Sequence, residues 1–427
     1  MEMRKKGGWE MDNVLQKPQR YQLSIFFMIL LVTLANYGIS LGFSLKPYMI
    51  FLLLFIFFHL SSFYFQRLQS FEVAMLLFYF TYCYSGVFAL HPDSSLRILL
   101  GITLYLTCYF IMKSILSYSN ISVVEKGIAN TGIFFNTASL ILYVLGIRST
   151  DFQFEGERVT VFGVLLDRSY PRLIGLLEDP NFFVFYNTLF FAYYLCHPNS
   201  WKNRVGLLLC IAANLLTFSR GGIVALVIMF FVYLLLNKPL KQIKIAVGTI
   251  LSLCLLIYVV TVQLKFGLLE IINSRFEDFS NDGGSGRFEL WDRAWTFFSD
   301  NMIFGIGAFN FSDYNFFYHN DTLTVHNTFL DILSESGLVG ITFYLIFIYL
   351  VFIQLCKFNV HRVRQYLFLT YIGFVLQMMF LSVIINDMFF MYIAILSTFL
   401  NSIQQEKERR IIRLRNNPYS NIRKQIS

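Results

Sequence analysis

The chain of 427 residues is 56% hydrophobic, contains 49 Phe and has only 14% charged residues. A soluble protein of this length could not cover its surface with so little charge, so composition excludes that class and predicts one polytopic membrane domain. The net charge of +8 does not indicate nucleic-acid binding, because the Lys and Arg residues are scattered over short loops and the C-terminal tail. The orientation of the protein in the membrane explains this distribution better.

Residues 1–22 are polar and basic, and the apolar run that follows has no small-residue cleavage site after it. We therefore expect a cytoplasmic segment and then the first membrane span, rather than a cleaved signal peptide. The six cysteines lie within or at the edges of apolar segments, without paired spacing. They indicate small core residues rather than disulfides or metal ligands.

Apolar runs long enough to cross a bilayer predict about twelve transmembrane helices in a single membrane domain, residues 23–403. They are expected near residues 23–43, 48–65, 71–90, 97–117, 127–146, 181–196, 204–219, 222–237, 245–263, 337–356, 367–385 and 388–403. The stretch 205–236 is interpreted as two helices, because one helix of 32 residues would be about 48 Å long, far beyond a hydrocarbon core of roughly 30 Å.

With the N-terminus in the cytoplasm, this topology places 22 of the 34 basic residues on the cytoplasmic side, as the positive-inside rule expects. They include those of the tail 404–427, which we expect to be solvated and to contact anionic lipid. Three polar segments then share the outer face: the loop 147–180, the turn 219–222 and the loop 264–336. Their common side predicts that recognition or chemistry takes place there.

The first outer loop ends in a helix start, because Asp179 suits the N-cap position and Pro180 the first helical position. Arg172, a little earlier, offers a permanent charge and a planar fork of donors that suits phosphate. It could equally be an interfacial arginine that snorkels or pairs with Glu178. Sequence alone leaves both interpretations open.

Arg220 stands in a turn between two short spans and is followed by two glycines, Gly221 and Gly222. Glycine permits a sharp turn, including a positive φ angle, and also lets a bulky ligand approach the backbone. A charged residue this close to hydrocarbon is costly and tends to be functional or paired, which favours a functional role.

In the second outer loop, residues 286–299 predict an amphipathic helix on the membrane interface. Its aromatic residues recur at helical spacing and are interpreted as packing groups rather than sugar platforms: Phe288, Trp291, Trp295 and Phe298. Ser285 is the expected N-cap of this helix. Arg287 opens the helix and could hold an anion over the same region as Arg172.

His326 begins an apolar-periodic segment that leads to the next membrane helix, which should hold its imidazole in place. A fixed imidazole at the membrane surface is a credible general base for a sugar hydroxyl, although a lone histidine is more often structural. Glu335 could be an alternative base, an orienting partner or a solvated charge. His319, His326 and the intervening Asp321 are weak evidence for a metal site, so no metal is expected.

Taken in order over about residues 165–345, these motifs resemble the bacterial O-antigen polymerase and ligase superfamily. They are Arg172-x-x-Gly175, Asp179-Pro180-Asn181, Leu216-Thr217-Phe218-Ser219-Arg220-Gly221-Gly222, Ser285-Gly286-Arg287 with Trp291, Gly305-Ile306-Gly307, His326-Asn327 and Gly337-x-x-Gly340. Met302 departs from the family, which often has Pro before the Gly-x-Gly turn.

The resemblance implies an all-α, GT-C-like polytopic membrane protein with a large, partly helical extracytoplasmic loop. It implies a metal-independent glycosyltransferase that needs no cofactor and acts outside the cytoplasmic membrane on glycans linked through pyrophosphate to undecaprenol. His326, Arg220 and Arg287 are then the expected catalytic residues. Substrate binding is assigned to Arg172, Arg168, Asn327, Glu335 and Trp291. Structural roles are assigned to Gly175, Asp179, Pro180, Asn181, Ser219, Gly221, Gly222, Gly305, Gly307, Gly337 and Gly340.

The function expected first is polymerisation of the repeat units of an O-antigen, capsule or exopolysaccharide. An O-antigen ligase or a protein O-oligosaccharyltransferase shares the motifs and is the alternative within the family. A flippase for lipid-linked glycans and a non-catalytic assembly partner are alternatives of other classes, and a flippase should carry more ionisable residues at mid-membrane. The expected partners are membrane lipid, a polysaccharide chain-length regulator and a flippase, but no nucleic acid.

Overall fold

In the computed structural model the described residues are 21–40, 44–150, 159–167, 170–240 and 286–415, with isolated positions between 242 and 261. The helices before the second loop are α1 (Gln22–Val32), α2 (Pro47–Phe58), α3 (Ser70–Ser85), α4 (Pro92–Ser117), α5 (Ile121–Ser149), α6 (Pro180–Cys196), α7 (Trp201–Leu216) and α8 (Arg220–Leu235). The later ones are α11 (Arg287–Asp300), α12 (Phe311–His319), α13 (Thr328–Lys357), α14 (Val360–Val363), α15 (Gln365–Met378) and α16 (Asp387–Arg415).

Helices occupy eleven of the twelve segments predicted as spans, and the predicted segment 245–263 lies largely outside the described residues. Among the described residues, four stretches are long and apolar enough to cross a membrane: Ser70–Phe88, which includes α3, together with α4, α5 and α13. The predicted class of helical membrane protein is therefore confirmed, whereas the number of about twelve spans and the GT-C-like fold stay predictions. α7 and α8 are separate helices, as the length of the stretch 205–236 required.

Two small antiparallel sheets were not predicted. β1 (Ile39–Ser40) pairs with β2 (Ser44–Leu45), so that α1 ends well before the predicted limit at residue 43. In the loop 147–180, β3 (Val159–Val161), β4 (Val164–Asp167) and β5 (Tyr170–Leu173) form a meander, with Leu165 of β4 opposite Arg172 of β5. Such short strands in a loop give too few residues for a periodic signal.

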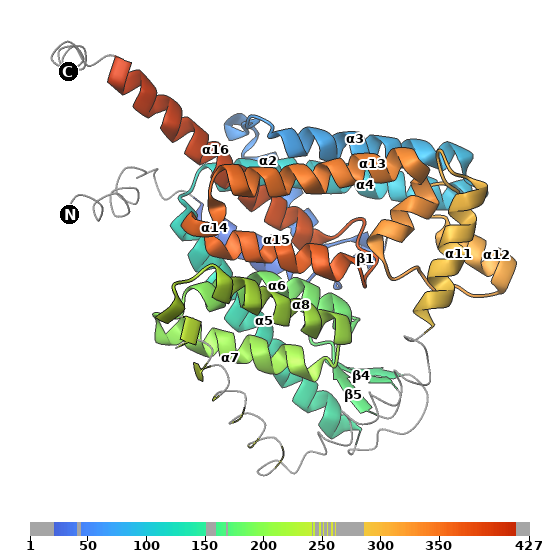
Figure 1. Cartoon of the computed structure of the whole chain (residues 1–427), viewed down its shortest axis with the longest axis horizontal. Coiled ribbons are helices and arrows are strands. Elements are labelled where there is room, and N and C mark those ends of the chain that lie inside the picture. Colours follow the sequence, from blue (N-terminus) through green and yellow to red (C-terminus); the bar gives the residue numbers. More distant parts are fainter. Residues whose placement is uncertain are drawn as a thin grey trace.

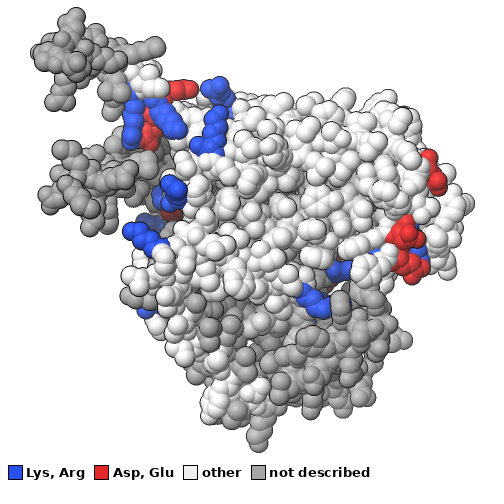
Figure 2. Space-filling model, in the orientation of Figure 1, with Lys and Arg blue, Asp and Glu red and all other residues white. Residues whose placement is uncertain are grey.

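The long helices lie side by side in one bundle (Figure 1). α14 and the C-terminal end of α16 lie at one end of this bundle, whereas α11, α12, β4 and β5 lie at the other (Figure 1). Basic side chains gather at the α14 end, and a broad uncharged surface separates them from the charged groups near α11 (Figure 2). This distribution matches a bundle whose middle faces hydrocarbon and whose two ends face water.

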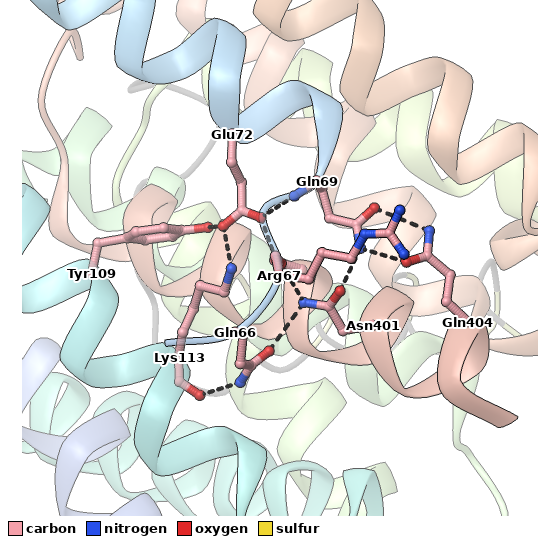
Figure 3. Close-up of polar contacts among 9 residues, drawn as sticks. Gln66, Arg67, Gln69, Glu72, Tyr109, Lys113, Asn401 and Gln404 are labelled. Carbon is pink, nitrogen blue, oxygen red and sulfur yellow. Dashed lines mark hydrogen bonds and ion pairs between the residues drawn. The ribbon is translucent and has the colours of Figure 1, made fainter. Parts of the chain in front are cut away.

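A buried polar network ties α3, α4 and α16 together at the α14 end (Figure 3). Glu72 of α3 is fully buried and accepts hydrogen bonds from Lys113, Tyr109 and Ser397. Around it, Gln69, Gln66 and Asn401 exchange side-chain hydrogen bonds of 2.7–3.1 Å. Glu72 was visible in the sequence as a charge inside an apolar run, but its partners came from two distant helices.

A second buried ion pair joins α2, α6 and α16. Asp387, 2% exposed, accepts hydrogen bonds from Lys46 Nζ at 2.6 Å and from the hydroxyls of Tyr48 and Tyr186 at 2.7 Å each. Lys46 precedes α2 and Asp387 begins α16. Charges buried among membrane helices are stable only when paired in this way, so both networks specify which helices are neighbours.

Candidate active site

Arg172 lies on β5 and connects the β-meander to the end of α7, just before α8. Its side chain is only 9% exposed, and its Nε donates a hydrogen bond of 3.1 Å to the carbonyl oxygen of Thr217. Two residues after β5, Gly175 has a φ angle of +60° and packs so closely on α5 that a Cβ atom would lie 2.3 Å from Ser139 Oγ. Only glycine fits there, which explains the predicted structural role of Gly175.

Arg220 is the first residue of α8, next to the start of α6. Ser219 caps α8 by accepting from the Gly222 N–H at 3.3 Å, and its hydroxyl donates to Asn181 Oδ1 at 2.7 Å. Asp179 caps α6 as predicted, accepting from the N–H groups of Asn181 and Phe182 at 2.7 and 3.1 Å, and Pro180 follows it at the first helical position. The N-termini of both helices therefore meet beside Arg220.

The glycines after Arg220 do not form a turn, which corrects the expectation for this motif. Gly221 and Gly222 lie inside the first turn of α8, and the residue with a positive φ angle is Phe218, at 50°. A Cβ atom on Gly222 would lie 2.8 Å from Val184 of α6, and one on Gly221 would lie 3.0 Å from Phe380. These glycines let α8 pack closely against neighbouring segments, so a role in admitting a ligand is not needed to explain them.

Arg287 brings the second loop to the same place. Burial and the charge of Arg220 lower the pKa of Arg287, Asp179 raises it, and Arg172 lowers it further. Charges act on one another only over limited distances, so Arg287 of α11 lies within electrostatic range of Arg220 on α8, Asp179 at the start of α6 and Arg172 on β5. These four residues, called the arginine cluster below, carry a net charge of +2, from three cations and one anion.

α11 begins with Gly286 at the N-cap, with a φ angle of 69°. The prediction that Ser285 is the cap is therefore wrong. The backbone at the N-cap position is left-handed, a conformation that glycine adopts readily. The helix itself is confirmed, with Leu290, Ala294, Phe297 and Phe298 buried, while Phe288 and Trp295 are 61% and 55% exposed.

The backbone next to His326 is held by Trp291 of α11. Trp291 lies four residues after Arg287, on the same face of the helix and about 6 Å along its axis. Its indole Nε1 donates to the carbonyl oxygen of Val325 at 3.1 Å, and Val325 is fully buried. His326 follows directly, half-buried and with a φ angle of 55°. A left-handed backbone is uncommon outside glycine, and such residues cluster at functional sites.

Asn327 and Glu335, predicted to bind substrate, both make structural contacts. Asn327 caps α13 by accepting from the N–H groups of Phe329 and Leu330 at 3.0 and 3.2 Å. Glu335 is 3% exposed, and its carboxylate accepts from the Tyr82 hydroxyl and, at 3.0 Å, from the Phe311 N–H at the start of α12. Tyr82 was missed by sequence analysis, because a tyrosine inside an apolar helix carries no local signal of its partner.

The remaining glycines of the motif form a backbone crossing between α13 and the segment before α12. α13 loses its helical geometry at Gly337, with φ 61° and ψ −160°. There Ile306 N–H donates to Ser334 O, and Gly307 N–H donates to Glu335 O, both at 2.9 Å. A Cβ on Gly305 would lie 2.4 Å from the Glu335 backbone. Gly340 packs its Cα against the side chain of Ser336 one turn earlier.

The structure thus puts Arg287 within electrostatic range of Arg172 and Arg220, and it joins the backbone beside His326 to Trp291, one helical turn after Arg287. Arg168 lies outside the described residues. Met302 stands before the Gly-x-Gly turn, where the family often has Pro. Its carbonyl oxygen accepts a hydrogen bond from the Leu338 N–H at 2.8 Å, and the turn forms without that proline. Clustered guanidinium groups offer several parallel N–H donors and a positive field, which suits a polyanion such as pyrophosphate.

The fold and the arginine cluster define a helical membrane protein with a polar site at one end of its bundle. Residues 205–345 match the family model described as O-antigen ligase. Over 213 residues the chain is 26% identical to the teichuronic acid biosynthesis protein TuaE of Bacillus subtilis (strain 168). The aligned region covers 46% of this chain and 43% of that protein. The matched region is less than half of either protein. Both similarities support an O-antigen ligase and polymerase-like family, as the motifs predicted.

Proposed function

We propose that this protein is a membrane glycosyltransferase that polymerises undecaprenyl-pyrophosphate-linked oligosaccharide repeat units of a surface polysaccharide on the outer face of the cytoplasmic membrane. The observation that carries the proposal is the arginine cluster, in which Arg172, Arg220 and Arg287 converge from three segments. Similar charges approach one another at an electrostatic cost, which a bound pyrophosphate would offset. The similarity to O-antigen ligases and to a teichuronic acid biosynthesis protein supports a reaction on glycans.

In the proposed reaction, a hydroxyl oxygen of the acceptor sugar attacks the anomeric carbon of the donor glycan. The new glycosidic C–O bond forms while the bond from the anomeric carbon to the pyrophosphate oxygen breaks, and the electron pair leaves with undecaprenyl pyrophosphate. His326 takes the proton of the attacking hydroxyl. The arginines stabilise the charge that develops on the leaving pyrophosphate, in a site arranged before the reaction begins.

Transfer of the glycan to a different acceptor, as by a ligase, is the second candidate, because the matching family model is described as O-antigen ligase. The two functions share the donor and the leaving group and differ only in the acceptor. Deletion of the gene, followed by gel analysis of the surface glycan, separates them. A single repeat unit on the final anchor indicates a lost polymerase, whereas long chains stranded on undecaprenyl pyrophosphate indicate a lost ligase.

The same deletion tests the whole class of function. Under the proposal, lipid-linked repeat units still reach the outer face and accumulate there, because only the transfer step is missing. Glycan that stays on the cytoplasmic side would instead assign the protein to transport and overturn the proposal. Complementation with the wild-type gene, and with a variant of the arginine cluster, shows whether the phenotype depends on that site.

A further inference from the structure

A large cavity lies at the end of the bundle opposite to the arginine cluster. Its volume is about 950 Å³, and it is open to the surface and lined by the start of α5, the corner between α14 and α15, and α16. Its apolar walls include Leu116, Val124, Ile395 and Phe399, which are each less than 9% exposed. The cavity plays no part in the proposed transfer reaction, since it is separated from the arginine cluster by the length of the bundle (Figure 1).

The rim of this cavity is basic. It carries four cations, Arg362, Arg364, Lys407 and Arg410, against two carboxylates, Glu125 and Glu406. The lining therefore has a net charge of +2, and Figure 2 shows Lys and Arg side chains gathered at this end of the molecule.

Two of the four cations are paired within the rim. Arg364 contacts Glu125 at 3.1 Å, and Arg410 contacts Glu406 on the same face of α16. Among the described residues, no carboxylate lies within 4.0 Å of Arg362 or Lys407, and Lys407 Nζ stands 5.1 Å from the ring centroid of Phe358. Arg362 and Lys407 are both exposed, so they can meet an anion that enters from solvent or from the leaflet.

The backbone adds to the positive field. Asn120, Ile121 and Ser122 line the cavity at the N-terminus of α5, a helix of 29 residues. No side-chain hydrogen bond from Asn120 caps this helix. The first N–H groups of a helix and its dipole favour an anion placed next to them. A helix terminus and a basic rim therefore act on the same space.

We propose that this cavity binds a phosphate ester, namely the head group of an anionic phospholipid from the surrounding leaflet. Phosphate matches the basic rim and the α5 terminus, while the buried apolar walls match the methylene groups next to the head group. Basic pockets between membrane helices bind anionic head groups through this combination. A soluble phosphate compound shares the rim chemistry but leaves the apolar walls without a partner, which is why the lipid is favoured.

The test uses the full chain purified in detergent and titrated with phosphatidylglycerol, cardiolipin and phosphatidylcholine, with bound lipid counted by native mass spectrometry. We expect the anionic lipids to bind and phosphatidylcholine not to bind. The double variant Arg362→Ala/Lys407→Ala should weaken anionic lipid binding about thirtyfold, at about fivefold for each basic side chain. The matched control Arg67→Ala/Arg409→Ala removes the same charge from exposed positions outside the cavity and should retain wild-type binding.

A second variant, Ser402→Trp, keeps every charge but fills the space between the walls, and it should reduce lipid binding as well. Equal loss in the cavity variant and in the control variant would overturn the proposal, because binding would then follow net charge alone. Binding of inorganic phosphate that is lost in Arg362→Ala/Lys407→Ala, without any binding of phospholipid, would also overturn it, since the occupant of the cavity would then be soluble. Unchanged melting temperatures confirm that each variant is folded.

Discussion

At the scale of single residues, the arginine cluster carries the proposed chemistry. Arg172 is positioned by Thr217, and Arg220 follows a serine that joins α6 to α8. Arg287 enters from a helix more than sixty residues further along the chain, and burial together with the charges of Arg220 and Arg172 lowers its pKa. Neutralising Arg287 should therefore affect the leaving group rather than the fold.

The first prediction concerns Arg287→Ala. Transfer activity should fall about 10²–10³-fold, the effect of removing one preorganised donor to a developing negative charge. Arg287→Lys should retain part of the activity, because it keeps the charge but loses the planar fork. The measurement is formation of glycan product from lipid-linked repeat units by the purified protein. Arg97→Ala, an exposed arginine outside the cluster, serves as the control, and an equal loss there would contradict a specific role.

The second prediction separates the imidazole of His326 from its backbone. Asn tolerates the left-handed conformation that His326 adopts, so His326→Asn should fold normally. If the imidazole is the general base, transfer should slow at least about 10²-fold. His319→Asn, at the end of α12, removes the other histidine of this loop and should leave the rate unchanged. Wild-type rates in both variants would move the base elsewhere, with the phosphate as the remaining candidate.

At the scale of elements, the glycine motif and the buried ion pairs decide how helices meet. Gly305 and Gly337 permit two backbones to cross within hydrogen-bond distance. The Glu72 network, in contrast, joins three helices through side chains that are unfavourable in hydrocarbon unless paired. The glycines bring helices together because they have no side chain, whereas the Glu72 network does so through paired charged and polar side chains.

The third prediction is that Gly337→Ala destabilises the protein. Its backbone angles are accessible to glycine almost alone, at a cost of about 1–3 kcal/mol for other residues, and a Cβ would lie 2.4 Å from Ile303 O. Gly101→Ala is the matched control, because a Cβ there meets no atom within 4 Å and alanine favours a helix by up to about 1 kcal/mol. Thermal unfolding in detergent should show a lower melting temperature only for Gly337→Ala.

The fourth prediction concerns Lys113→Met, which would leave Glu72 buried without its cation (Figure 3). Breaking a buried pair from one side costs about 3–5 kcal/mol, whereas replacing both partners is much less harmful. The double variant Glu72→Gln/Lys113→Met should therefore unfold closer to the wild-type temperature than Lys113→Met. Arg67→Ala breaks an exposed pair with Glu408 and should change stability little. Similar melting temperatures for all variants would show that the pair is not a tie between helices.

At the scale of the whole molecule, the described polar segments gather at the two ends of the bundle. The β-meander, the start of α8, α11 and α12 occupy one end, and the basic cavity occupies the other (Figure 1). This arrangement agrees with the predicted topology, in which three polar segments share a face. It supports the proposal that transfer takes place on the outer side and that the basic tail lies in the cytoplasm.

The fifth prediction tests this orientation with a membrane-impermeable maleimide on intact cells. In a background without the six native cysteines, Asp292→Cys on α11 should be labelled at once. Glu408→Cys, exposed near the end of α16, should be labelled only after permeabilisation. The reverse pattern would place the arginine cluster on the cytoplasmic side and remove the basis for transfer on the outer face.

Several features of the fold were determined by local sequence. Apolar runs predicted the helices, including the separation of α7 from α8, because hydrophobic length is a property of consecutive residues. Asp179 and Pro180 predicted the start of α6, since capping depends on neighbours within one turn. The ordered motifs also predicted the family, which the comparisons support.

Only the tertiary structure decided how distant groups combine. It assigned Glu335 to Tyr82 and to the start of α12, and it gave Gly221 and Gly222 a packing role in place of the expected turn. It also brought Arg287 to Arg220 and formed the basic cavity between α5, α14 and α16. These contacts join residues that are tens to hundreds of positions apart. Tertiary packing selects such partners, and the local sequence of either segment does not indicate which residues they will be.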